Sequence, residues 1–176
     1  GAGGTAVCRT IINNGTLTIT GTNNLDVYGD WANNSSFVFN TSSITFRGSA
    51  NNTLAGTTAT TFYSLIINKV ATANTVTSTT SVFTTTNLTI TQGNLVLTNP
   101  PATPINVRYV VTGNISVPAA GILTDNVNWD ANSHLLSVGG NIDIDGIFNY
   151  NSGNLPHVNM NGAGNKTVRT GSDPLS

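Results

Sequence analysis

Apolar and small polar residues alternate over short stretches along the whole of this chain. The alternation is clear in Leu17 and Ile19, Leu25 and Val27, Phe37 and Phe39, and Ile44 and Phe46. A period of two predicts strands with one buried face. Apolar residues at helical spacing are absent. The pattern therefore predicts an all-β protein whose short strands turn a corner roughly every eight to twelve residues.

Asparagine and glycine mark these corners. Asparagine pairs end four early segments, and Gly-Asn takes the same place later: Asn13-Asn14, Asn23-Asn24, Asn33-Asn34 and Asn51-Asn52, then Gly93-Asn94, Gly113-Asn114, Gly140-Asn141 and Gly153-Asn154. Both residue types tolerate left-handed backbone angles, which would explain their place at turns. Stacked asparagine amides can also form ladders along the axis of a stack of coils.

This spacing favours a right-handed parallel β-helix, or β-solenoid, of roughly seven coils of about 25 residues each. The alternative is a pair of β-sandwich domains of about 90 residues each. In the solenoid, one apolar ladder is expected to fill the interior: Leu17, Ile19, Phe37, Phe39, Phe46, Leu65, Ile67, Leu88 and Ile90.

The chain is predicted to be one solenoid unit, residues 1–176, with two related halves. The segment 25–40 (LDVYGDWANNSSFVFN) aligns without a gap with 136–151 (LSVGGNIDIDGIFNYN), and 44–54 aligns with 158–168. Such a long-range match is typical of repeat architectures. The halves, about 1–98 and 105–176, are joined by a proline-rich excursion at 99–104, because proline cannot donate to a strand ladder.

Charge is scarce. Only 7% of the 176 residues are charged, the net charge is −1 and glutamate is absent, whereas about 25% is usual. A surface of hydroxyls and amides suits a secreted or stacking protein. The six basic residues are scattered, which argues against nucleic-acid binding. No apolar run approaches the roughly 18 residues of a membrane span.

The sequence offers little catalytic chemistry. The only histidines, His134 and His157, both lie at or next to predicted strands, and no nucleophile has an evident base beside it. The aspartates do not match a calcium-binding loop. Cys8, the only cysteine, is interpreted as a small buried residue on the first strand, with a reactive or intermolecular thiol as the alternative. We therefore expect no enzyme activity, cofactor or metal.

Two binding functions remain open on the residues alone. Trp129, flanked by Asn128 and Asn132, is a candidate for glycan contact, although its ring would also suit packing under its own loop. Arrays of threonine suggest ice binding as a minor alternative function, but a threonine-rich strand surface explains these arrays as well. These threonines are Thr75, Thr77, Thr79, Thr84, Thr85, Thr86, Thr89 and Thr91.

Several segments resemble repeats of very large, adhesin-like parallel β-helix proteins on the surface of Bacteroidetes and related bacteria. The likeness lies in Gly29-Asp30-Trp31 with Asn33-Asn34, in ITFRG with NNTL (44–54), and in FYSLIIN (62–68). It covers nearly the whole chain except the proline segment and the final residues. The second copy departs from the pattern, with Ile142 in place of the tryptophan. The resemblance implies secretion, surface display and no enzyme activity in the repeats.

Open ends are the remaining feature of such a coil. They behave as exposed sheet edges, and no helix or charged cap is evident at residues 1–10. We expect self-association end to end or by strand addition, or contact with flanking repeats of a larger chain. The function predicted is thus an extracellular structural or adhesive β-solenoid, with a monomeric glycan- or surface-binding adhesin as the alternative.

Overall fold

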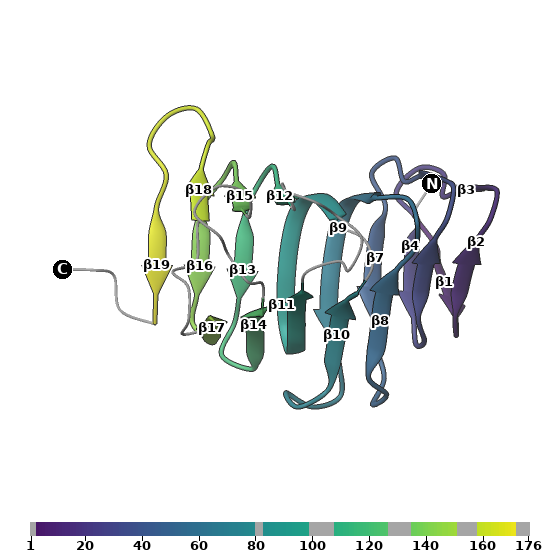
Figure 1. Ribbon diagram of the computed structural model, residues 1–176, viewed down its shortest axis with the longest axis horizontal. Helices are drawn as coiled ribbons and strands as arrows, with labels where there is room; N and C mark the ends of the chain where they lie inside the picture. The colour runs from purple at the N-terminus through teal and green to yellow at the C-terminus, as the bar shows by residue number, and fades with distance from the viewer. Residues whose placement is uncertain (1–2, 80–82, 99–107, 127–134, 151–157, 172–176) are drawn as a thin grey trace.

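The computed structural model describes residues 3–79, 83–98, 108–126, 135–150 and 158–171, and all regular elements within them are strands. The strands stack into an elongated coil, with β1 and β2 at one end and β19 at the other (Figure 1). Every strand pairing described is parallel, each strand lying against its counterpart in the next coil. The predicted β-solenoid is confirmed, because two sandwiches would need antiparallel sheets.

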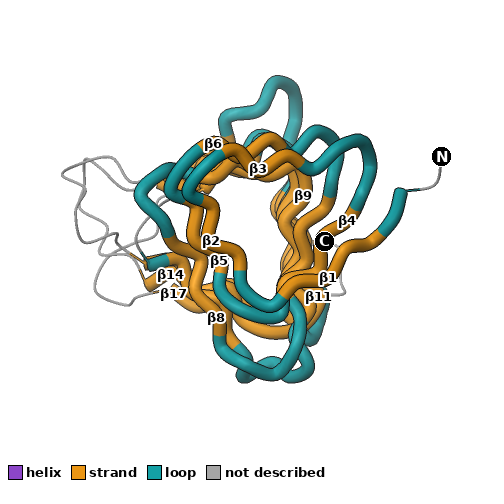
Figure 2. Tube along the Cα trace, turned by 90° about the vertical axis from the view of Figure 1, so that its right-hand side faces the viewer, coloured by secondary structure: helices purple, strands orange, loops and turns teal. Residues whose placement is uncertain are grey.

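The coil has three faces, visible when it is viewed along its axis (Figure 2). From the N-terminal end, β1, β2, β3 and β4 follow one another clockwise away from the viewer, so the coil is right-handed. The first face contains the middle of β11 and the C-terminal half of β9 together with β1 (Thr5–Cys8), β4 (Asn24–Val27), β7 (Ser43–Phe46), β13 (Ile115–Val117), β16 (Ile142–Ile144) and β19 (Val168–Thr170).

The other two faces complete each turn. The second face contains the end of β11 and six further strands: β2 (Ile11–Asn13), β5 (Trp31–Asn33), β8 (Asn52–Ala55), β10 (Thr75–Ser78), β14 (Gly121–Asn126) and β17 (Ile147–Tyr150). The third face contains the starts of β9 (Thr60–Asn68) and β11 (Phe83–Thr98), with β3 (Thr16–Thr18), β6 (Ser36–Val38), β12 (Arg108–Val111), β15 (Leu135–Val138) and β18 (Val158–Met160). Both β9 and β11 therefore bend across corners without losing strand structure.

The coils lengthen toward the C-terminus. On the first face, register partners are separated by 19 residues (5 to 24), 19 (24 to 43), 21 (43 to 64), 23 (64 to 87), 27 (88 to 115), 27 (115 to 142) and 26 (142 to 168). The strands of this face are no longer at the C-terminal end than at the N-terminal end. Apart from a register shift between Ile90 and Gln92, where this face ends in β11, the ladder keeps its register, so most of the extra residues lie outside it.

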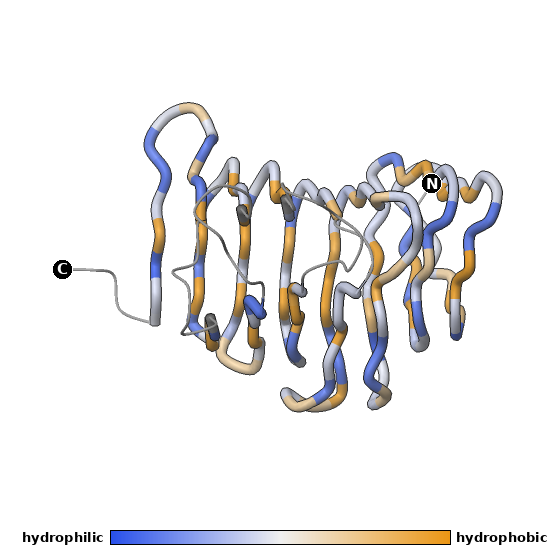
Figure 3. Tube along the Cα trace, viewed as in Figure 1, coloured by the Kyte–Doolittle hydropathy of each residue, from blue (hydrophilic) through white to orange (hydrophobic). Residues whose placement is uncertain are grey.

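Apolar side chains at matching register positions form rows inside the coil, and apolar stretches recur from coil to coil in Figure 3. One row on the first face consists entirely of buried residues: Leu25, Ile44, Leu65, Leu88, Ile115 and Ile142. Burial of about 25 cal/mol per Å² of apolar surface makes such rows the main source of stability.

Aromatic rings form a second interior row, which follows the third face. The ring centroids of Phe37 and Phe62 are 5.9 Å apart, those of Phe62 and Phe83 are 6.3 Å apart, and those of Phe83 and Tyr109 are 5.2 Å apart. Trp31 packs edge-on against Phe37 at 4.9 Å. These tilted and edge-to-face geometries are the favourable ones for aromatic pairs, so the row links successive coils.

Most of the predicted interior ladder is confirmed. Phe46, Leu65, Ile67, Leu88 and Ile90 are buried. The other four residues, Leu17, Ile19, Phe37 and Phe39, are only partly covered. They belong to the first two coils, on or beside the two-stranded sheet β3–β6, where fewer coils lie above them.

The aligned sequence segments begin on different faces of the coil. Segment 25–40 begins on β4 of the first face, whereas 136–151 begins on β15 of the third. Likewise 44–54 begins on β7 of the first face and 158–168 on β18 of the third. The second copy of the repeat thus begins on a different face from the first. This is possible because the same strand–corner–strand motif fits any two successive faces. The division into two halves stays a prediction, and the excursion 99–104 lies outside the described residues.

Phe62 and Tyr63 provide a direct test of the aromatic row. Phe62 is fully buried, whereas its neighbour Tyr63 points outward and is 37% exposed. We expect Phe62→Ala to lower the free energy of unfolding by about 3–5 kcal/mol, and Tyr63→Ala to lower it by less than about 1 kcal/mol. Urea denaturation followed by circular dichroism measures both. Equal losses in the two variants would contradict this assignment of faces.

Candidate functional site: the open N-terminal end and the corner asparagines

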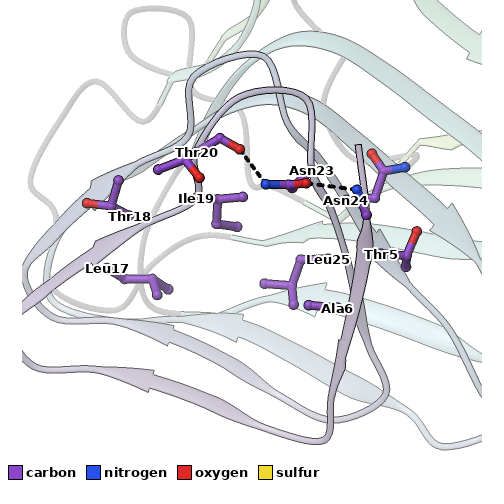
Figure 4. Close-up of a pocket in the computed structure, with 10 residues that line it drawn as sticks. Thr5, Ala6, Leu17, Thr18, Ile19, Thr20, Asn23, Asn24 and Leu25 are labelled. Carbon is purple, nitrogen blue, oxygen red and sulfur yellow. Dashed lines mark hydrogen bonds between the residues drawn. The ribbon is translucent and has the colours of Figure 1, made fainter. Parts of the chain in front are cut away.

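The N-terminal end of the coil exposes part of the apolar interior. Leu17, Ile19 and Leu25 converge on one hollow of about 480 Å³, which Ala6 also lines (Figure 4). A second hollow of about 550 Å³ opens beside it, between Ile11 and Leu17. Leu17 and Ile19 are only half-buried there. The hollows mark the place where a further coil would continue the interior rows.

The strand edges at this end are also open. Within the described residues β1 pairs only with β4. The carbonyls of Gly4 and Cys8 accept hydrogen bonds from the N–H groups of Asn24 at 2.8 Å and Tyr28 at 3.0 Å. Since alternate residues of a parallel strand bond to opposite sides, the peptide groups of Thr5 and Val7 point toward the open edge.

The C-terminal end of the coil likewise leaves interior apolar side chains incompletely covered. Val168 of β19 continues the interior row above Ile142 and is 47% exposed, while Val158 and Met160 of β18 are only partly buried. Arg169 forms two parallel hydrogen bonds with Asp143 of the preceding coil, at 2.8 and 2.7 Å. These bonds lower the pKa of Asp143 and raise that of Arg169.

Asparagine side chains at the corners bond one coil to the next. Where the third face meets the first, Asn87 Oδ1 accepts a hydrogen bond from the N–H of Asn114 at 3.2 Å. Asn114 Oδ1 accepts one from Asn141 at 2.8 Å, and Asn141 Oδ1 accepts one from Thr167 at 3.1 Å. Each of these three corner N–H groups thus finds a side-chain acceptor one coil below.

The early asparagine pairs use their amides in two ways. Asn13 is 6% exposed, and its Nδ2 donates to Asn33 Oδ1 and to the Ser36 carbonyl, both at 2.8 Å. Its exposed neighbour Asn14 instead offers Oδ1 as the acceptor for Asn34 Nδ2, at 2.9 Å. The predicted amide ladder is therefore confirmed for these coils.

The expected reason for the asparagine pairs is wrong. The only described non-glycine residue with positive φ is Asn40, at 45°, and it belongs to none of the pairs. The pairs occupy corners because their side chains bond to the adjacent coil. For the Gly-Asn corners the expectation is confirmed at Gly93, with a φ of 105°, but not at Gly113 or Gly140. Gly140 serves for close approach instead: a Cβ on it would lie 2.4 Å from Asn114 Oδ1 and 2.5 Å from the Gly113 carbonyl carbon. Gly153-Asn154 lies outside the described residues.

Two buried polar side chains were not foreseen. Lys69 is 2% exposed, and its Nζ donates to the Arg47 carbonyl at 2.5 Å and to Asn52 Oδ1. Burial lowers the pKa of this amine. The Tyr109 hydroxyl contacts Ser78 Oγ at 3.0 Å and donates to the Thr98 carbonyl at 2.8 Å, and burial raises its pKa to about 12. Both lie between coils and are structural.

Cys8 lies at the N-terminal opening. It is on β1, as the sequence interpretation expected, but it is half-buried rather than buried, and its thiol contacts the Asp26 carbonyl at 3.6 Å. Burial first, and the nearby Asp26 carboxylate second, raise the pKa of the thiol. A raised pKa lowers the thiolate fraction and hence the reactivity.

The threonines considered for ice binding do not form one surface. Thr84 and Thr86 point outward from the third face, Thr85 is buried, and Thr89 lies on the first face. Thr75 and Thr77 belong to the second face. The alternative explanation, a threonine-rich strand surface, therefore accounts for these residues.

The glycan candidates Trp129, Asn128 and Asn132 lie outside the described residues, as do His134 and His157. Within the described ranges, no group of three or more His, Cys, Asp or Glu residues could hold a metal ion. The same ranges contain no helix long and apolar enough to cross a membrane. No family model matches the chain, and neither a curated protein nor a solved structure shows a significant match to it.

Asn13 and Asn14 test the corner bonding with the same substitution. Asn13→Asp places a carboxylate opposite two acceptor oxygens in a buried position, so we expect unfolding free energy to fall by at least about 2 kcal/mol. Asn14→Asp keeps the acceptor that Asn34 needs on an exposed site, and should change stability by less than about 0.5 kcal/mol. Urea denaturation compares them. A tolerated Asn13→Asp would refute the buried amide pair.

Proposed function

We propose that this chain is a non-enzymatic structural and adhesive β-solenoid of the bacterial cell surface, which stacks end to end into a fibre or stalk. The observation that carries the proposal is the open N-terminal end, where interior side chains and the Thr5 and Val7 peptide groups face outward. Unsatisfied edges of this kind favour pairing with another strand.

The two ends are suited to each other. Each ends in parallel strands on all three faces, β1, β2 and β3 at one end and β17, β18 and β19 at the other. When β19 of one copy pairs with β1 of the next, Val168 continues the interior row toward Ala6. Such head-to-tail contacts do not close on themselves, so they generate filaments. Flanking repeats of a larger chain would use the same edges.

Composition and resemblance support placing this element outside the cell. Charged residues make up only 7% of the chain, and the corners are bonded by neutral amides whose strength does not depend on salt. The likeness to adhesin-like surface repeats points the same way. The monomeric adhesin remains the alternative, and an outer groove lined by Arg9 and Tyr28 favours a binding role.

Val7→Pro tests end-to-end stacking. Proline removes the N–H that Val7 directs toward the open edge, while the bonds of Gly4 and Cys8 to the second coil remain. Sedimentation velocity and electron microscopy should show concentration-dependent filaments for the unmodified chain and for Val7→Thr, but monomers for Val7→Pro. Circular dichroism confirms that all three fold.

Two outcomes would overturn the proposal. One is an unmodified chain that stays monomeric at its highest soluble concentration. The other is a Val7→Pro variant that assembles as readily as Val7→Thr.

A further inference from the structure

An outer groove crosses the corners between the first and second faces in the first four coils. It has a volume of about 730 Å³ and is lined by Val7, Cys8, Arg9, Thr10, Tyr28, Gly29, Gly48, Ser49, Ala50 and Val70. Since coils rise by about 4.8 Å, it extends for roughly 14 Å along the axis. Cys8 and Thr10 also line the hollow beside Ile11, so the groove borders the open end of the coil.

Two glycines form the floor of the groove. A Cβ on Gly29 would lie 2.3 Å from the Arg9 carbonyl oxygen, so no side chain fits there. Gly48 has a φ of 82°, and a Cβ on it would lie 3.0 Å from Cδ1 of Tyr28. The Tyr28 ring therefore rests against bare backbone and remains 43% exposed. The groove thus presents an aromatic ring supported from below.

The free charge in the groove is positive. Arg47 is paired with Asp26 at 2.6 Å, and Arg169 with Asp143. Arg9 is exposed and has no ion-pair partner among the residues that the structure describes. An unpaired guanidinium beside an exposed ring selects a carboxylate-bearing ligand, because arginine binds carboxylates through two parallel hydrogen bonds.

Several main-chain N–H groups along the groove are already hydrogen-bonded within the coil, so they cannot pair with a peptide. The N–H groups of Tyr28, Arg47 and Val70 are bonded to the carbonyls of the coil below, at 3.0, 2.8 and 3.2 Å. A peptide laid across the coils would leave its own main chain without partners. A sugar chain, in contrast, binds through its ring faces and substituents, which the Tyr28 ring, the Thr10 and Ser49 hydroxyls and Arg9 can contact.

We propose that this groove binds an acidic glycan chain of the uronic-acid type. Arg9 binds a sugar carboxylate, and the Tyr28 ring packs against the apolar C–H face of a neighbouring sugar ring. Val7 and Val70, 68% and 67% exposed, flank the chain on either side. The groove borders the stacking edge, since Val7 belongs to β1, but its Arg9 and Tyr28 side chains take no part in the strand pairing on which stacking rests.

Titration calorimetry with a hexameric oligogalacturonate tests the proposal, with maltohexaose as the neutral probe of similar length. We expect saturable binding of the acidic sugar, and an affinity loss of at least about tenfold in both Tyr28→Ala and Arg9→Gln. Tyr63→Ala removes an exposed tyrosine on another face, and Lys166→Gln removes one positive charge near the other end. Both controls should bind like the unmodified chain.

Absent binding, or equal binding of maltohexaose, would overturn the proposal. So would an equal loss in Lys166→Gln, which would indicate non-specific charge attraction, or preferential binding of an acidic peptide of similar length. Titrations at a protein concentration at which sedimentation velocity shows only monomers separate this result from assembly, because the groove can bind without stacking and stacking can occur without binding.

Discussion

The hydrogen bond from a corner N–H to a side-chain oxygen one coil below is the interaction on which the rest of this structure depends. Strand ladders satisfy the backbone along the faces. At the corners some N–H groups, such as those of Gly113 and Gly140, still bond to carbonyls of the adjacent coil, whereas others bond to a side chain. Asn87, Asn114 and Asn141 supply the missing acceptors between the third and first faces. Neutral amides can be stacked at successive coils without the repulsion that like charges would bring, which accounts for the scarcity of charge.

Fixed corners keep the interior rows in register while the coils grow. The first-face steps increase from 19 to 27 residues, yet Leu25, Ile44, Leu65, Leu88 and Ile115 follow one another without interruption. The aromatic row from Phe37 to Tyr109 spans the coils on the third face in the same way. Additional residues are therefore accommodated between strands, and the surface can vary while the core stays constant.

Period-two alternation predicted the strands and most of the core, because the two faces of each strand have fixed environments, and the spacing of the corners favoured stacking those strands as a coil. The sequence pattern could not show that the third face begins as the separate sheet β3–β6. Nor could it show that the aligned segments 25–40 and 136–151 begin on different faces. The burial of Lys69 depends on the Arg47 carbonyl and Asn52, about one coil earlier in the sequence. The groove of Arg9 and Tyr28 is likewise created by the 19-residue stacking step, which no local pattern reveals.

Hydrogen exchange of the corner amides, measured by NMR, tests the central claim most directly. The N–H groups of Asn141 and Thr167 are exposed at corners, yet each is bonded to an asparagine of the coil below. The account predicts exchange protection close to that of the adjacent strand amides of Asp143 and Arg169, because opening requires separating two coils. Exchange of the corner amides at the rate of an open loop would contradict it.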